Sequence, residues 1–100
     1  MNVHWTDPAQ SDLYSILEYI VGDNPDAADR VEQRILGAVE ALAEHPRRGR
    51  PGRIAETREL VVPGLPYVVV YTITQPRPAA DPEVAILRVV HGARRWPTDA

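Results

Sequence analysis

The sequence predicts an α+β domain with the element order β-α-α-β-β-β, in which a helical hairpin packs on a small antiparallel sheet. Two observations carry this prediction. The first half of the chain holds two amphipathic helical stretches with a very short joint, and the second half holds three runs rich in β-branched and aromatic residues. A length of 100 residues supports a single hydrophobic core. We therefore expect one domain at residues 1–97 and a short tail at 98–100.

The chain is expected to open with a short strand and a helix. The stretch NVHW at residues 2–5 alternates weakly in polarity, which indicates a short first strand. Asp7 can then cap a helix, Pro8 suits its first position, and Gln10 lies three residues beyond Asp7, as in a capping box. Apolar side chains follow at helical spacing until residues 22–24 end the helix, and they are Leu13, Ile16, Leu17, Ile20 and Val21.

A second helix is predicted to start directly afterwards. Asn24 and Pro25 repeat the start signal, and Asp26 complements the helix dipole. The apolar stripe consists of Ala28, Val31, Ile35, Ala38, Val39 and Leu42, and EHP at residues 44–46 closes the helix. A joint this short between two such helices indicates an antiparallel hairpin.

The second half predicts three strands. Residues 46–56 are rich in Pro, Gly and Arg, which indicates a solvated loop. The predicted strands follow at residues 57–62, 67–74 and 83–90. Turn-like segments separate them, so we expect an antiparallel meander. The run YVVVYTI at 67–73 is apolar on both faces, which predicts a middle strand covered by helices on one side and by a partner or a loop on the other.

Composition excludes several classes of site. There is no cysteine, and the three histidines (residues 4, 45 and 91) are not spaced as metal ligands, so we expect neither a metal nor a cofactor. No apolar run approaches the roughly 20 residues of a membrane span, and the first residues do not resemble a signal peptide. We expect a cytoplasmic protein without a membrane partner.

Charge is distributed unevenly along the chain. Residues 1–46 hold nine acidic side chains against two arginines, whereas residues 47–100 hold nine arginines against five acidic side chains. All eleven basic residues are arginine. Guanidinium groups suit carboxylate or phosphate partners, but they stay protonated and cannot act as general bases near neutral pH.

Two arginine clusters are the candidate binding residues. Five arginines fall within twelve positions, namely Arg47, Arg48, Arg50, Arg53 and Arg58. They form either a solvated loop or a surface for phosphates or an acidic peptide. The second cluster is HGARRWP at 91–97, in which Arg94, Arg95 and Trp96 follow the last strand. Its arginines either contact a partner or pair with acidic residues of the helices, for which the candidates are Glu18, Asp26 and Glu32.

These residues give little support for a catalytic site. His91 is the one histidine near other polar side chains, and no nucleophile-base-orienter set or carboxylate pair is evident. Acid–base cleavage of RNA stays open, with His91 or a carboxylate as the base.

Several stretches, taken in order, carry a family resemblance. They are DPAQSDLYSILEYI at 7–20, NPDAADRVEQRI at 24–35, PRRGRPGR at 46–53, TRELVV at 57–62, YVVVYTI at 67–73 and ILRVVHGARRWP at 86–97. Together they resemble the RelE/ParE toxins of bacterial type II toxin–antitoxin modules, over nearly the whole chain. The resemblance implies the same helical hairpin on a small sheet, and a single toxin domain at residues 1–97.

The resemblance also discriminates between targets. RelE-type members cut mRNA in the ribosome with basic residues. At two positions where those members are basic, this chain is apolar: Val68, directly after the tyrosine of the central strand, and Leu60, two positions after Arg58. A terminal helix with a late tyrosine is not present in the sequence. Losing groups that stabilise a transition state costs orders of magnitude in rate. The resemblance therefore favours the ParE-like branch, which poisons DNA gyrase and needs no covalent chemistry of its own.

Two alternatives remain. One is a ribosome-dependent mRNA endonuclease that uses Arg58, His91 and Arg94 as catalytic residues. The other is an antitoxin-binding module without an active target.

The partner that the resemblance implies is a ParD-like antitoxin, whose C-terminal segment folds on binding. The expected docking zone is the second apolar face of residues 67–73, with Leu65 and the arginine rim. The residues expected to contact the target or partner are Arg50, Arg53, Arg58, Leu65, Arg94, Arg95 and Trp96.

Overall fold

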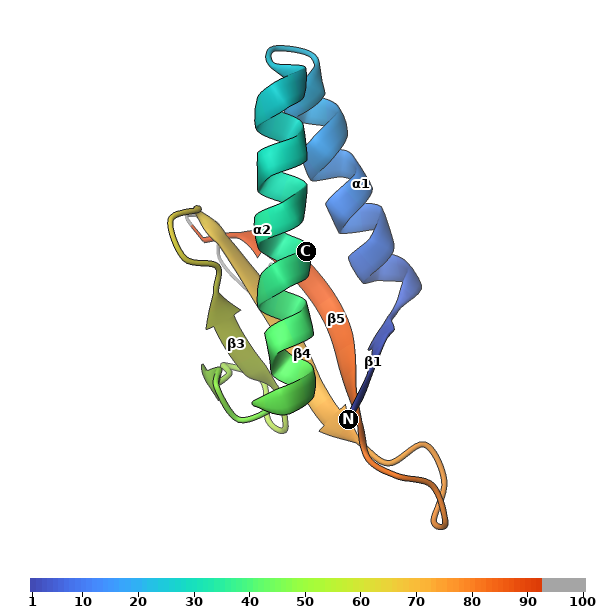
Figure 1. Ribbon diagram of the computed structural model, residues 1–100. Helices are drawn as coiled ribbons and strands as arrows, with labels where there is room; N and C mark the ends of the chain where they lie inside the picture. The colour runs from blue at the N-terminus through green and yellow to red at the C-terminus, as the bar shows by residue number, and fades with distance from the viewer. Residues whose placement is uncertain (93–100) are drawn as a thin grey trace.

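The computed structural model describes residues 1–92 and confirms the predicted α+β class. Figure 1 shows two helices lying over one face of a twisted sheet. The elements are β1 (Asn2–Trp5), α1 (Asp7–Val21), α2 (Pro25–Glu44), β2 (Arg50–Pro51), β3 (Arg58–Val61), β4 (Tyr67–Thr74) and β5 (Glu83–His91). The predictions for Arg94, Arg95, Trp96 and the tail at 98–100 fall outside the described residues.

The sheet has the order β1-β5-β4-β3-β2, so β4 is the central strand. The antiparallel meander of β3, β4 and β5 is confirmed. The expectation of a purely antiparallel sheet is wrong, because β1 pairs parallel with β5, with Asn2 opposite Glu83. Between β1 and β5 the chain passes through both helices and then through β2, β3 and β4. The two antiparallel turns of the meander give β5 the direction of β3, and this is also the direction of β1.

The helix starts follow the predicted chemistry, with one shift. The N-cap of α1 is Thr6 rather than Asp7, because the Thr6 hydroxyl accepts the Ala9 N–H at 3.3 Å. Asp7 is then the first residue of the helix, where its charge complements the dipole. Asn24 caps α2 as predicted, and its side chain accepts the Ala27 N–H at 3.1 Å.

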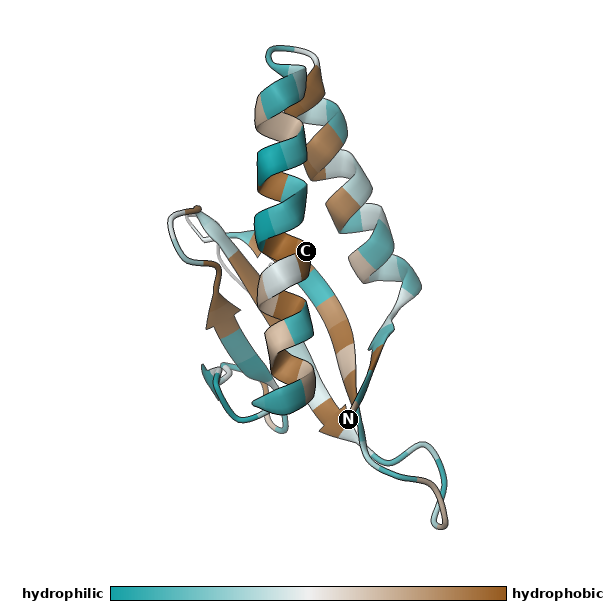
Figure 2. Ribbon diagram, viewed as in Figure 1, coloured by the Kyte–Doolittle hydropathy of each residue, from teal (hydrophilic) through white to brown (hydrophobic). Residues whose placement is uncertain are grey.

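The hydrophobic core lies between the hairpin and the sheet. In Figure 2 the apolar colour of α1 and α2 alternates with polar colour along each helix, as expected for helices with one buried face. Most of the largest fully buried side chains come from α2, β4 and β5, and they include Ile35, Val39, Leu42, Tyr71 and Ile86. Neither helix in residues 1–92 combines the length and apolarity that a membrane crossing requires.

Helix α1 binds β5 through Asp12, next to a β-bulge. The pairing shifts between Val70, which faces Arg88, and Tyr71, which faces Ile86. Beside this bulge the Asp12 carboxylate accepts hydrogen bonds from Arg88 Nε at 2.7 Å, Arg88 Nη2 at 2.9 Å and the Val89 N–H at 2.9 Å. The hydrogen bond that Arg88 donates to Asp12, together with the negative charge of Asp12, raises the pKa of Arg88 against the opposing effect of burial. This pair therefore fixes the hairpin relative to the sheet.

Candidate partner-binding surface

The arginine-rich loop between α2 and β3 is anchored by the buried Tyr71 of β4. The Tyr71 hydroxyl donates to the Pro46 carbonyl at 2.7 Å and accepts the Gly49 N–H at 2.9 Å. A Cβ at Gly49 would lie 2.7 Å from the Tyr71 ring and hydroxyl, so only glycine allows this approach. The start of the loop is thus held against the sheet.

A buried carboxylate organises the rest of the loop. Glu59 is only 4% exposed, and its side chain accepts hydrogen bonds from Arg50 Nη2 at 3.3 Å and from the Arg53 N–H at 3.0 Å. Arg50 and Pro51 form β2 and pair with Glu59 and Arg58. Most of the loop is exposed, as the prediction of a solvated loop requires, but Glu59 also holds residues 50–51 against the edge of the sheet.

The predicted binding arginines divide into two kinds. Arg58 Nη1 donates to the Gly49 carbonyl at 2.8 Å and to the Arg47 carbonyl at 3.4 Å, so it braces the loop. By contrast, Arg47, Arg48, Arg50 and Arg53 are exposed along the loop. They present a basic surface on a fixed backbone rather than on a flexible one.

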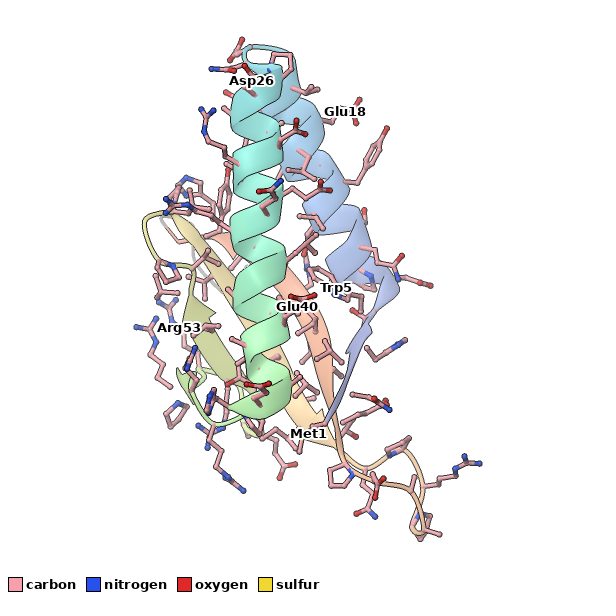
Figure 3. All side chains as sticks on the ribbon, in the orientation of Figure 1. Met1, Trp5, Glu18, Asp26, Glu40 and Arg53 are labelled. Carbon is pink, nitrogen blue, oxygen red and sulfur yellow. The ribbon has the colours of Figure 1, made fainter. Side chains whose placement is uncertain are left out.

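Two of the predicted acidic partners lie far from the arginine loop. Figure 3 shows Glu18 and Asp26 at the far end of the hairpin, while Arg53 lies beside β3. In the described part of the chain, the ion pair between the helical layer and the sheet is Asp12–Arg88, which the sequence analysis did not anticipate. The predicted pairing of Arg94 and Arg95 with acidic residues of the helices falls outside the described residues, because both arginines follow residue 92.

The residues of the ribonuclease alternative do not meet. His91 pairs with Tyr67, with their rings edge to face at 5.6 Å, whereas Arg58 pairs with Tyr71, four positions further along β4. Four strand residues span about 13 Å. The third residue, Arg94, is outside the described chain. His91 and Arg58 thus lie too far apart to hold one phosphate between them.

The predicted docking zone on the second face of the central strand is not open. Val68 is 9% exposed and Val70 is 0% exposed, so both are already covered within this chain. Leu65 is half-buried and packs against the core. The exposed apolar side chain of this region is instead Val61, at the edge of the sheet.

Sequence reasoning missed a groove of about 300 Å³ between α2 and β3. Its lining residues are Arg34, Gly37, Ala38, Ala41, Arg48, Leu60, Val62 and Pro63. Arg48 also lines an adjoining shallow hollow with His45, Pro46 and Arg47. The signal in the sequence was the row of small residues on α2, at spacings of three and four, which leaves room beside a neighbouring strand.

Two solved structures share this arrangement. The chain resembles the chromosomal ParDE toxin–antitoxin system from P. aeruginosa, with 26% identity and a TM-score of 0.79 over 91% of this chain and 95% of that one. A YoeB/ParE toxin from Agrobacterium tumefaciens, at 12% identity, shares the fold with a TM-score of 0.58 over 91% of this chain and 98% of that one. The fold is therefore that of the toxins of type II toxin–antitoxin systems.

Sequence comparisons narrow this class to one family. The ParE toxin family of type II parDE systems matches residues 3–96. A putative toxin, Y4kP, of Sinorhizobium fredii is 47% identical over 95% of this chain and 92% of its own length. Toxin RelE2 of Caulobacter vibrioides is 44% identical over 92% of this chain and 96% of its own length. The chain belongs to the ParE toxin family.

Proposed function

We propose that this protein inhibits DNA gyrase by binding, without covalent chemistry of its own, and that a ParD-like antitoxin neutralises it. The observation that carries this proposal is the packing of two positions that are basic in RelE-type ribonucleases. Val68 is nearly buried, and Leu60 packs against the hydrophobic core. Apolar side chains in packed positions supply neither charge nor proton transfer to a phosphate.

The geometry of the remaining polar residues supports the same choice. Arg58 donates to the carbonyls of Arg47 and Gly49, and His91 lies at the other end of β4. An RNA-cleaving site needs its groups within hydrogen-bond reach of one phosphate. A protein that acts by contact alone needs only a fixed surface, and the anchored arginine loop provides one.

An antitoxin partner fits the charge of that surface. The P. aeruginosa system that this chain resembles is, by its name, a toxin with its antitoxin. Acidic side chains of an antitoxin would pair with the exposed Arg50 and Arg53 and accelerate encounter. From the sequence we add Arg94, Arg95, Trp96 and Leu65 as candidate contact residues. The compartment of the proposed function is the cytoplasm, because gyrase acts there.

Inducible expression without the antitoxin tests the proposal. Plasmid supercoiling and bulk mRNA are followed in parallel, and co-expression of the antitoxin is the control. We expect growth arrest with loss of negative supercoiling and intact messages. Cleaved messages with unchanged supercoiling would establish the ribosome-dependent endonuclease instead. Harmless expression with neither response would establish a binding module without an active target.

A further inference from the structure

We infer that the connection between β4 and β5, residues 75–82, is a rigid prong that inserts into an apolar pocket of the protein that this toxin inhibits. The inference rests on the proposed function, because it names the element by which the toxin contacts gyrase. The prong is a different segment from the arginine loop, which is proposed to meet the antitoxin. The length, the internal hydrogen bonds and the surface chemistry of the prong support the inference.

The prong is longer than the fold requires. Thr74 and Glu83 are the last paired residues of β4 and β5, and residues 75–82 join them. About two to five residues usually suffice to join two such strands. Figure 1 shows the connection extending beyond the end of the sheet, and all its residues except Ala80 are exposed. The additional length buries little within residues 1–92, so we attribute it to a contact outside the chain.

Contacts within the prong hold it in one shape. Gln75 Nε2 donates to the Pro78 carbonyl at 2.9 Å and to the Ala80 carbonyl at 2.8 Å. The Ala80 N–H donates to the Arg77 carbonyl at 3.0 Å, which closes a β-turn with Pro78 at its second position. The prolines at 76, 78 and 82 restrict the backbone further. A segment that is already fixed loses little conformational entropy on binding, which suits it to a preformed pocket.

The outward surface of the prong is mostly apolar. Its three prolines have no N–H, and the carbonyls of Arg77, Pro78 and Ala80 already accept hydrogen bonds within the prong. Pyrrolidine rings and alanine methyl groups make up much of what remains, with Arg77 and Asp81 as the charged side chains. No carboxylate within residues 1–92 forms an ion pair with Arg77.

This chemistry selects a protein partner rather than a nucleic acid. The charges of Arg77 and Asp81 balance, so the prong supplies no net positive charge for a phosphate backbone. Proline-rich segments bind pockets lined by aromatic side chains, and arginine is a frequent anchor of protein interfaces. The complementary site on gyrase is therefore an apolar pocket with a carboxylate at its rim for Arg77.

Shortening the prong tests the inference directly. Replacing residues 75–82 by the dipeptide Asn-Gly closes the hairpin with a turn that antiparallel strands favour. The measurement is the toxin concentration that half-inhibits supercoiling by purified gyrase, and we expect it to rise by about tenfold or more. Circular dichroism, thermal unfolding and antitoxin binding should stay close to those of the wild type, because the prong contributes little to the core.

Two point substitutions test the cation and the rigidity separately. Arg77→Glu should weaken gyrase inhibition by about tenfold, because it places a negative charge against the carboxylate of the pocket. Gln75→Ala removes the donor that holds two carbonyls, and should weaken inhibition by about threefold or more without lowering the unfolding temperature. Asp81→Asn changes the other charge of the prong and is the matched control, with less than about a twofold effect.

The outcomes separate this inference from the proposed function. Loss of gyrase inhibition by variants that still bind the antitoxin supports the prong. Full inhibition by Arg77→Glu and Gln75→Ala would refute the prong and leave gyrase as the target, and these two variants decide the matter if the shortened chain does not fold. A gel shift of plasmid by toxin alone, abolished by Arg77→Glu, would assign the prong to DNA and overturn the protein pocket. A wild-type toxin that does not inhibit gyrase would overturn the proposed function, and the inference with it.

Discussion

A single buried hydroxyl determines the position of the arginine loop. Tyr71 is fully buried, and its hydroxyl satisfies both a carbonyl and an N–H of the segment that follows α2. Buried backbone groups that lose their partner are costly, because water cannot replace it. The basic surface thus depends on a residue that lies beneath it and contacts no partner.

Tyr71→Phe should therefore destabilise the fold even though it removes only one oxygen atom. We expect a loss of about 1–3 kcal/mol in the free energy of unfolding, since the Pro46 carbonyl and the Gly49 N–H both lose their partner. Urea denaturation monitored by circular dichroism measures it. Tyr14→Phe removes an exposed hydroxyl and should cost less than about 0.5 kcal/mol. Equal effects of the two substitutions would show that the Tyr71 bonds are unimportant.

Asp12 binds a backbone N–H in addition to its ion-pair partner Arg88. It binds the Arg88 side chain and the Val89 N–H, so Asp12→Ala removes all three of these hydrogen bonds, whereas Arg88→Ala leaves the bond between Asp12 and the Val89 N–H in place. We expect Asp12→Ala to be the more destabilising change, and a double-mutant cycle to give a coupling energy of about 0.5–1 kcal/mol for this partly exposed pair. Equal losses from the two single substitutions would contradict a role for the Val89 bond.

The pH dependence of that coupling follows from the pKa of Arg88. Because the folded-state pKa is raised, the contribution of this cation is fully present below its ordinary pKa and is lost only as pH rises through the raised value. The coupling energy should therefore be the same at about pH 7 and about pH 10. A marked fall at the higher pH would mean that another group controls the interaction.

The sequence places Arg94 and Arg95 beyond the last strand, where two charged side chains are not needed for core packing. Arg94→Ala and Arg95→Ala should reduce toxicity more than thermal stability. Growth arrest on induction and the unfolding temperature are the two measurements. Parallel losses in both would identify these residues as structural ion-pair partners.

The glycines of two neighbouring elements should respond oppositely to the same change. Gly37 lies inside α2 facing open space, so Gly37→Ala should stabilise the protein by about 0.5–1 kcal/mol. Gly49 lies against Tyr71, so Gly49→Ala should destabilise it and displace the arginine loop. Thermal unfolding measures both. Stabilisation by both changes would contradict the close approach of Gly49 to the ring.

The helices and the meander could be predicted because their signals are local. Pro8, Pro25 and Asn24 mark helix starts at fixed positions, and the β-branched runs mark strands. The parallel pairing of Asn2 with Glu83 could not be read in the same way, because it joins residues that are distant in the sequence. The N-cap of α1 is Thr6 and not the predicted Asp7, although both residue types can cap a helix. The Thr6 hydroxyl also donates to the Ile86 carbonyl at 2.7 Å, a contact between distant residues that the local sequence does not reveal.

The candidate site was less predictable than the fold. The clustering of arginines was visible, but their roles depend on tertiary partners, such as the buried Glu59 that holds Arg50 and the loop carbonyls that hold Arg58. The groove beside Gly37 depends on how far α2 covers β3, which no single segment encodes. Sequence therefore indicated the kind of chemistry, and packing decided which side chains present it.

Charge polarity characterises the molecule as a whole. Arg53 of the basic loop lies beside β3, whereas Glu18 and Asp26 lie at the far end of the hairpin, so the loop presents its positive charge away from these two carboxylates. We expect association with an acidic antitoxin to slow as ionic strength rises, because exposed charges are screened beyond about 8 Å at physiological salt. Stopped-flow association rates across a salt series measure this. A rate independent of salt would exclude steering by the arginine surface.

The most direct test of gyrase inhibition uses purified components. Purified toxin is titrated into a gyrase supercoiling reaction, with toxin pre-bound to its antitoxin as the control, and programmed ribosomes with a defined message are treated alongside. The proposed function predicts dose-dependent loss of supercoiling, relief by the antitoxin and an uncut message. Unimpaired supercoiling together with a cut message would contradict it.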